Sequence, residues 1–283
     1  MKQLLFFILC TYLSGATVTG QTAFQDESLL LGVVEPSELM NRAWYKDGKT
    51  AYTPYKASVQ KLKTVLAGKT IEVFFGSWCS DSQREVPRLM ATLESIHVPI
   101  TLIAVDSNPA TRNVSPTGEE TGKYIFRVPT IIVYEDGQEV GRLVEYPKLS
   151  IERDLVNLIQ DESYLPNYPS YLLLAQLDRE GALEDPNVDY HGLAMTLQPY
   201  IATDSDLRSA ARIFQNMEKE ATQKKLLLVN AYLFKDVLDA QEDLMQYYIT
   251  KNDPDQARAV LTTYLHRHPK DKRAKLLERT LQK

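Results

Sequence analysis

The chain has 283 residues, of which 44% are hydrophobic and 24% are charged, and its formal net charge is −5. A chain of this length accommodates about two domains, and the composition is that of a soluble globular protein. The acidic balance, with no basic stretch interleaved with aromatic residues, argues against nucleic acid as a partner.

Residues 1–20 have the pattern of a secretory signal peptide. After a short charged start, Leu4 to Leu13 is apolar, and a run of small residues ends at Gly20. We therefore expect export, with cleavage near Gly20. An N-terminal membrane anchor is the alternative, but the apolar stretch is short for a span. Cleavage would remove Cys10 and leave Cys79 as the only cysteine, so no internal disulfide is expected.

Residues 21–54 are interpreted as an N-terminal extension. It contains an apolar run that predicts a strand, a helical or irregular stretch, and an Asp-Gly pair that predicts a turn: Leu29–Val34, Pro36–Tyr45 and Asp47–Gly48. A helix is expected next, over Tyr55–Ala67, where apolar residues recur at helical spacing before a glycine.

The most informative stretch of the chain follows that helix. Ile71–Phe75 is a short apolar run of β-branched and aromatic residues, which predicts a buried strand. A Gly-Ser pair ends it, and Trp78 and Cys79 then precede a helical pattern that runs to about Ile96. A cysteine at a strand-to-helix turn lies near the first helical amides and the positive end of the helix dipole, which both favour thiolate over thiol.

Three further strands and a closing helix are expected before residue 162. The strands are Ile100–Val105, Ile131–Tyr134 and Gln138–Val144, the last two joined by an Asp-Gly hairpin turn, and the helix is Leu149–Ile159. Asp106 follows the first of these strands, at a carboxyl end where ligands gather in open α/β sheets. The polar segment Asn108–Gly122 is either a wall over the cysteine or a surface insertion.

The order of these features resembles the thioredoxin family. A Trp-Cys-x-x motif follows an apolar strand, Pro87 lies within the following helix, and Val128-Pro129-Thr130 precedes a second apolar strand. The resemblance covers residues 55–162. It implies an α/β thioredoxin fold, a central mixed sheet flanked by helices, in which the peptide bond before Pro129 is cis and Pro129 faces Cys79.

This chain departs from the family pattern at three places. The second cysteine of the family's Cys-x-x-Cys motif is Ser82, so the motif is Cys-x-x-Ser. The usual Gly-Pro between the cysteines is Ser80-Asp81. The buried acid that many members carry before the first cysteine is Val73. That acid serves the second thiol, so its absence agrees with the absence of that thiol.

The resemblance implies thiol–disulfide exchange by one nucleophilic cysteine. Cys79 would attack a disulfide, and Ser82 would donate a hydrogen bond to the thiolate without being able to resolve the mixed disulfide. Release then needs an external thiol, which favours monothiol exchange or isomerisation. The residues expected to contact the substrate, a protein or a small thiol or disulfide, are Trp78, Ser80, Asp81, Val128, Pro129 and Thr130.

The second half of the chain, residues 163–283, predicts helices only. Helical spacing recurs in seven stretches, Tyr171–Leu177, Tyr190–Tyr200, Leu207–Met217, Lys224–Phe234, Leu238–Ile249, Pro254–His268 and Lys272–Leu281. Asp185-Pro186 and Asp253-Pro254 are expected helix starts. The unit from Leu238 to Pro269 resembles a tetratricopeptide repeat, with Leu244, Tyr248, Ala257 and Leu261 at packing positions.

A second function stays open beside exchange. The alternative is a redox-inactive thioredoxin-fold binding module whose helical domain recruits a partner protein. No cofactor is expected, and the four histidines lack metal-ligand spacing, so no metal site is expected either. No membrane span is expected after signal cleavage. An exported thioredoxin-like chain of this build resembles those of Gram-negative envelopes, which implies a periplasmic location.

Overall fold

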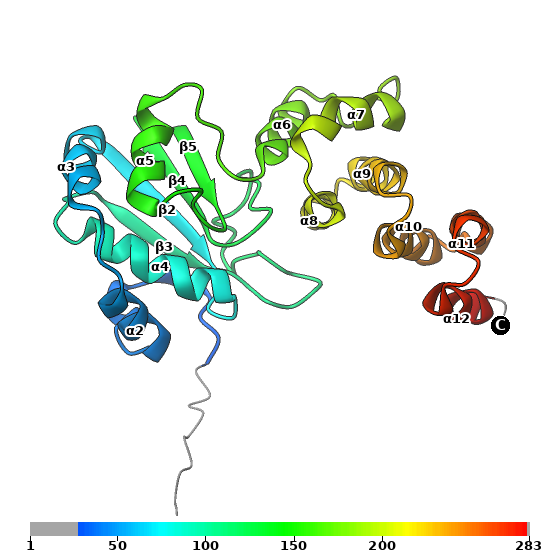
Figure 1. Ribbon diagram of the computed structural model, residues 1–283, viewed down its shortest axis with the longest axis horizontal. Coiled ribbons are helices and arrows are strands. Elements are labelled where there is room, and N and C mark those ends of the chain that lie inside the picture. The colour runs from blue at the N-terminus through cyan, green and yellow to red at the C-terminus, as the bar shows by residue number, and fades with distance from the viewer. Residues whose placement is uncertain (1–27, 282–283) are drawn as a thin grey trace, which may run out of the picture.

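The computed structural model describes residues 28–281, so the predicted signal peptide lies outside the described residues. Its N-terminal half contains a five-stranded mixed sheet in the order β1-β3-β2-β4-β5. The second half consists of helices that stack one after another away from the sheet (Figure 1). The coarse prediction, an α/β region followed by a helical region, is confirmed.

The sheet places β2 at its centre. Its strands are β1 Gly32–Val34, β2 Lys69–Phe75, β3 Ile100–Ala104, β4 Thr130–Glu135 and β5 Gln138–Val144. Strand β2 pairs parallel with β3 and antiparallel with β4, and β1 adds antiparallel to β3. The predicted hairpin turn joins β4 to β5, where Asp136 and Gly137 both have positive φ, as the tight turn requires.

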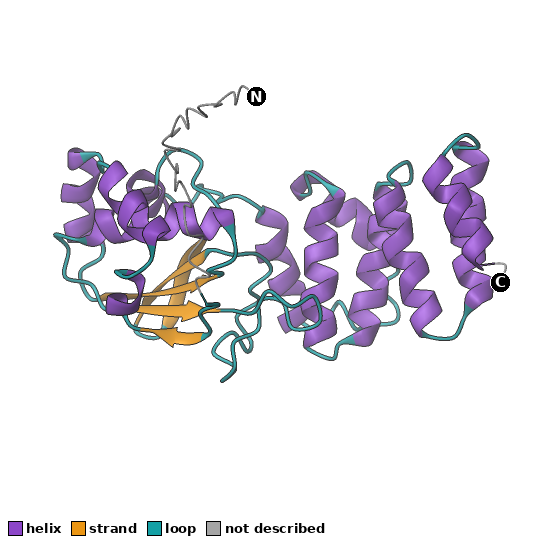
Figure 2. Ribbon diagram, turned by 90° about the horizontal axis from the view of Figure 1, so that it is seen from below, coloured by secondary structure: helices purple, strands orange, loops and turns teal. Residues whose placement is uncertain are grey.

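One face of the sheet is covered by helices. These are α1 Pro36–Leu39, α2 Ala43–Ala51, α3 Lys56–Val65, α4 Ser80–Leu93 and α5 Ile151–Gln160. Figure 2 shows helices along one side of the strands. Alternate residues of β2, such as Val73 and Phe75, are buried with helix residues such as Leu62 and Leu89. The segment expected as an extension belongs to this core, since β1 lies in the sheet and Leu39 is fully buried.

The prediction of a turn at Asp47-Gly48 is wrong, because both residues lie inside α2. The reason is tertiary. Helix α2 packs against α4 so closely that a Cβ on Gly48 would lie 2.8 Å from Cγ of Pro87. The glycine therefore permits a close approach between two helices and does not end one, a distinction that the local sequence does not carry.

The other face of the sheet is covered by the long segment between β3 and β4. Phe74, Ile103 and Ile132 point to this face and are buried with Ile125 and Val128 of the segment. The segment contains turns and no helix. It therefore brings loop residues, and not a helix, to the carboxyl end of β2.

The helical region begins after residues 161–168, which follow α5. Its helices are α6 Pro169–Arg179, α7 Tyr190–Leu197, the 3₁₀ turn η1 Gln198–Tyr200, α8 Asp204–Asn216, α9 Glu220–Leu233, α10 Leu238–Thr250, α11 Pro254–Arg267 and α12 Lys272–Leu281. The prediction of a helix start at Asp185-Pro186 is wrong. Helix α7 begins later, because Asp189 caps it by accepting the amides of His191 and Gly192.

The start at Asp253-Pro254 is confirmed, with the Asp253 carboxylate accepting the Gln256 amide at 3.1 Å. Helices α10 and α11 pack as a hairpin, and the predicted packing residues Leu244, Ala257 and Leu261 are all buried. No helix within residues 28–281 has both the length and the apolar character needed to cross a membrane.

The two regions share a hydrophobic core. Tyr124 and Phe126 of the covering segment and Val144 of β5 are buried together with Tyr171 of α6 and Phe214 of α8. The rings of Phe126 and Tyr171 lie 4.7 Å apart, and those of Phe126 and Phe214 lie 5.8 Å apart. The helical region is therefore packed onto the sheet region directly, and α8 comes to lie beside the carboxyl end of β2.

Candidate functional site: a pocket at Cys79

Cys79 lies at the N-terminus of α4, directly after the turn that ends β2. It is the N-cap residue, its amide donates to the Gly76 carbonyl at 2.9 Å, and its carbonyl accepts the Gln83 amide at 2.9 Å. It is half-buried and is the one cysteine within residues 28–281. Its backbone thus begins the helix, and its side chain makes no capping hydrogen bond to the amides of the first turn.

The sulfur contacts the segment that precedes β4. The Cys79 thiol donates to the Val128 carbonyl, with Sγ and the oxygen 3.4 Å apart. The Val128–Pro129 peptide bond is cis, which confirms the expectation drawn from the sequence. The thiol and the residue before the cis proline are therefore neighbours, although 49 positions separate them in the chain.

Ser82 lies one helical turn after Cys79 and is completely buried. Its hydroxyl oxygen accepts the amide of Gly76 at 3.1 Å. Within the described residues, no hydrogen bond joins Ser82 to the Cys79 sulfur, which was the contact expected from the sequence. Ser82 instead holds the turn between β2 and α4, and so positions Cys79.

A pocket of about 250 Å³ opens beside the thiol. Its walls come from both regions of the molecule. The residues that line it are Trp78, Cys79, Arg112, Asn113, Phe126, Arg127, Val128, Glu145, Ser209, Arg212 and Ile213. The last three belong to α8, so the helical region forms one wall of the cysteine's surroundings.

Trp78 forms the part of the pocket next to Cys79. Its indole Nε1 donates to the Val105 carbonyl at 2.9 Å, which fixes the plane of the ring. The ring packs against Gly76, where a Cβ would lie only 2.6 Å from Cε2 of the indole. The guanidinium of Arg112 lies over the Trp78 ring, 4.3 Å from its centroid. This cation–π contact orients Arg112 at the pocket.

The loop that carries Arg112 is ordered by Asp106 and Asn113. The Asp106 carboxylate accepts the Thr111 hydroxyl at 2.6 Å and the Asn108 amide at 3.0 Å. These hydrogen bonds, that of Thr111 first, hold the pKa of Asp106 below its ordinary value. Asn113 Nδ2 donates to the Phe126 carbonyl at 3.2 Å and so ties the loop to the pocket. Of the two readings of the polar segment, the structure therefore agrees with a wall beside the cysteine.

Arg127 lies in the pocket wall and all of its charge is compensated. Its guanidinium stacks on a tyrosine and donates to four side chains, the hydroxyls and carboxylates of Tyr171, Glu145, Ser205 and Asp206. The distances are 2.7 Å to Tyr171, 2.9 Å to Glu145 and 2.8 Å to Ser205. Arg127 thus joins the sheet region to α6 and α8.

Arg212 lies across the same pocket and differs from Arg127. Among residues 28–281, no hydrogen bond or ion pair reaches its half-buried guanidinium. Burial lowers the pKa of Arg212, the positive charges of Arg112, Arg208 and Arg127 lower it further, and Asp243 acts in the opposite direction. Asp243 is itself bonded to Arg208, with Nε and Oδ2 2.6 Å apart.

The structure brings only part of the predicted site together. Cys79, Trp78 and Val128 line the pocket. Pro129 is buried and its carbonyl accepts the Glu145 amide at 2.7 Å, while the Thr130 hydroxyl donates to the Arg127 carbonyl at 2.7 Å.

The two residues between Cys79 and Ser82 lie outside the pocket. Ser80 is exposed at the start of α4. Asp81 is paired with Arg84 on the helix surface, with Nη2 and Oδ1 2.7 Å apart. Neither side chain lines the pocket beside the thiol.

The sequence did not point to the arginines of the pocket. Arg112 lies in a polar loop and Arg212 on an amphipathic helix of another region, so neither belongs to a motif with Cys79. The length and polarity of Asn108–Gly122 indicate only that this segment is a wall over the cysteine or a surface insertion. Nothing local in α8 indicates which of its residues meets the pocket.

No family model matches this chain, and the comparison with curated proteins likewise yields no match. Within residues 28–281, no group of three or more histidine, cysteine, aspartate or glutamate side chains is arranged to hold a metal ion.

Proposed function

We propose that this protein is a thioredoxin-fold thiol–disulfide exchange protein that acts through Cys79. One observation carries the proposal: a half-buried thiol at a helix N-terminus opens into a pocket and lies 3.4 Å from the carbonyl of Val128, the residue before a cis proline. The mixed sheet with β2 at its centre supports the same assignment.

The exchange proceeds in two balanced steps. The Cys79 thiol loses its proton to solvent, and the thiolate attacks one sulfur of a disulfide. The old S–S bond breaks, a mixed disulfide with Cys79 forms, and the second sulfur leaves as a thiolate. An external thiolate then attacks the mixed disulfide and restores Cys79, because no second cysteine lies among residues 28–281.

The surrounding residues position the thiol. Cys79 is the N-cap residue of α4, and Ser82 holds the turn on which Cys79 depends through its bond to the Gly76 amide. Trp78, fixed by its bond to Val105, lines the pocket next to Cys79. In this proposal Ser82 is a positioning residue, and Cys79 alone reacts.

We include export to an oxidising compartment, the periplasm of a Gram-negative cell, in the proposal. The support is the signal-peptide pattern of residues 1–20 together with a single remaining thiol. Disulfides persist in such compartments, so an exchange protein has substrates there.

The second candidate is a binding module in which the thiol plays no part. It is favoured by the shared core at the junction, because the helical region covers one side of Cys79 and restricts approach to it. The two candidates differ in the reactivity of the folded thiol, and one experiment separates them.

The test compares the reactivity of Cys79 in the folded chain with its reactivity in the unfolded chain. The chain from Gln21 onward is mixed with 2-hydroxyethyl disulfide, and mixed-disulfide formation is followed by intact mass, in buffer and in urea. We expect the folded thiol to react at least about tenfold faster than the unfolded one, since only the fold places the sulfur beside a pocket that can receive the disulfide. Cys79→Ser serves as the blank. A folded thiol that reacts no faster than the unfolded one rejects exchange in favour of the binding module.

A further inference from the structure

The lining of the pocket beside Cys79 has more positive than negative side chains. Three arginines line it, Arg112, Arg127 and Arg212, and Glu145 is the single acidic residue in its lining. Glu145 is bonded to Arg127, with Oε1 and Nη1 2.9 Å apart, and also to Tyr168. The other two arginines therefore remain without a carboxylate in the pocket.

A cation in this position is unfavourable unless an anion joins it. Arg212 is half-buried, so it has lost part of its hydration without gaining a hydrogen-bond acceptor. One face of the Arg112 guanidinium lies on the Trp78 ring, 4.3 Å from the ring centroid. The N–H groups at the edge of the guanidinium stay available to a ligand. Both guanidinium groups line the same cavity, and a guanidinium can donate two parallel N–H bonds to a carboxylate.

The pocket suits a small molecule better than an extended polypeptide. Its volume of about 250 Å³ lies just below the ordinary range for small-ligand sites. Ser209, Arg212 and Ile213 of α8 close one side of it. The carbonyl of Pro129 is already bonded to the Glu145 amide, which leaves less free backbone for a peptide strand to pair with.

We propose that Arg112 and Arg212 bind the carboxylate of a low-molecular-weight thiol whose sulfur exchanges with Cys79. This inference rests on the proposed function and names the substrate class of that site. The carboxylate lies between the two guanidinium groups, and the sulfur of the same molecule meets Sγ of Cys79. When the mixed disulfide forms, the carboxylate stays bound, and the departing thiolate takes a proton from solvent.

The experiment uses two disulfides of similar length and different charge. The dianion 3,3′-dithiodipropionate and the neutral 2-hydroxyethyl disulfide are reacted separately with the chain from Gln21 onward, and intact mass gives the rate of mixed-disulfide formation. The measured quantity is the ratio of the two rate constants, anionic over neutral. A change in thiolate reactivity alone alters both rates equally and leaves this ratio unchanged.

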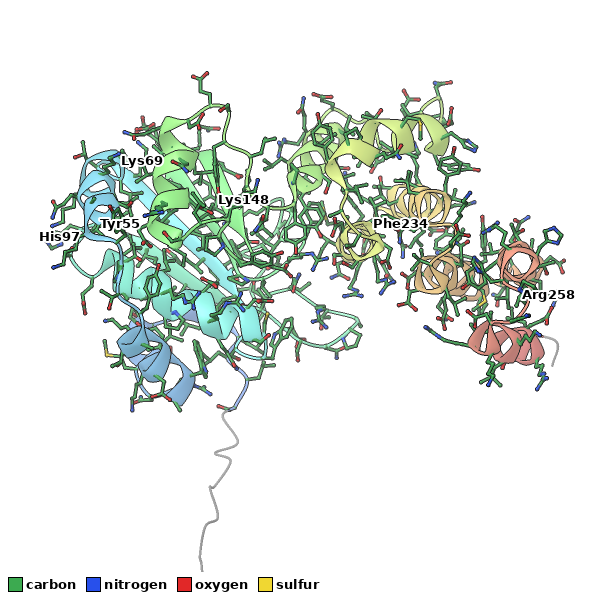
Figure 3. All side chains as sticks on the ribbon, in the orientation of Figure 1. Tyr55, Lys69, His97, Lys148, Phe234 and Arg258 are labelled. Atoms are coloured by element: carbon green, nitrogen blue, oxygen red, sulfur yellow. The ribbon has the colours of Figure 1, made fainter. Side chains whose placement is uncertain are left out.

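Arg212→Met and Arg112→Met each remove one charge and keep a side chain of similar length. We expect each to lower the ratio about tenfold at low ionic strength, because one charge-assisted contact is lost. The matched control is Arg258→Met, which removes the same charge at the far end of the helical region (Figure 3). It should leave the ratio unchanged. Added salt should lower the wild-type ratio and have less effect in the two pocket variants.

Each outcome has one meaning. A ratio that does not change in either pocket variant overturns the anion site and leaves exchange by Cys79 intact. A ratio that falls equally in Arg258→Met overturns it too, since net charge would then explain the effect. Failure of both disulfides to react faster with the folded chain than in urea rejects the proposed function itself. Should Arg212→Met not fold, Arg112→Met on the loop carries the test alone.

Discussion

An arginine at the junction between the two regions and an arginine in the neighbouring pocket differ in their hydrogen-bond partners. At the junction, Arg127 is bonded to Tyr171, Glu145, Ser205 and Asp206. In the pocket, Arg212 has no hydrogen-bond partner within residues 28–281, although it is also half-buried and lies on the same helix as Ser205 and Asp206.

The presence or absence of hydrogen-bond acceptors distinguishes a structural arginine from one that we propose binds a ligand. A buried cation whose acceptors are all present contributes to holding two regions together. One that lacks acceptors costs stability, and a protein retains it where a ligand supplies the missing group. The following changes test this comparison in order of decreasing effect.

Arg127→Met breaks the junction. It leaves the buried Asp206 and the half-buried Glu145 without their cation, so we expect a loss of about 3–5 kcal/mol in the free energy of unfolding. Urea unfolding followed by circular dichroism measures it. Arg258→Met, a surface control, should cost less than about 0.5 kcal/mol. A loss in Arg127→Met as small as that of the control would contradict the role of Arg127 at the junction.

Alkaline pH weakens the same junction. Burial, the larger cause, raises the pKa of Tyr171, and burial with the bond to Asp178 raises the pKa of Tyr124. Both tyrosines keep their protons in the folded state after the unfolded chain has lost them at about pH 10. Their stabilisation is thus full below pH 10 and is lost as the pH rises towards the folded values.

The expected decline is up to about 1.4 kcal/mol per pH unit for each such tyrosine. Urea unfolding between about pH 9 and pH 11 measures it, and Tyr171→Phe should make the decline shallower. An identical slope in wild type and Tyr171→Phe would show that Tyr171 titrates alike in both states.

Trp78→Phe changes a residue that lines the pocket. It removes the indole N–H that donates to the Val105 carbonyl, so we expect a loss of about 1 kcal/mol in the free energy of unfolding. It also weakens the surface on which Arg112 stacks, and the anionic-over-neutral rate ratio should fall with it. A variant with lower stability and an unchanged ratio would separate Trp78 from the positioning of Arg112.

Arg212→Met has the smallest expected effect on stability, between zero and a gain of about 0.5 kcal/mol, because a half-buried cation with cationic neighbours is replaced by an apolar side chain. The free energies of unfolding of Arg212→Met and Arg127→Met, measured under the same conditions, compare the two arginines directly. A loss as large as that of Arg127→Met would show that Arg212 is structural, and would remove the reason to reserve it for a ligand.

Much of the sheet region was predictable because its signals are local. The apolar run of β2, the Asp136-Gly137 turn and the helix start at Cys79 each depend on neighbours in sequence. Gly48 shows where this fails, since its role depends on a helix that follows much later in the chain. The predicted helix start at Asp185 is wrong because a second aspartate, Asp189, caps α7 four residues later.

The site was predictable only in its sheet half. Cys79 and Val128 belong to motifs, so their meeting follows from the resemblance. Arg212 belongs to none. The spacing of Leu207, Ala211 and Phe214 shows which face of α8 is apolar, but the angle at which α8 packs on the sheet region decides that Arg212 reaches the pocket.

The contribution of α8 to the pocket has a consequence for the order in which the protein matures. Synthesis produces Cys79 first and Arg212 much later, so a nascent chain presents its thiol before the wall that surrounds it exists. In our proposal, the anion site is therefore complete only once α8 has packed against Phe126.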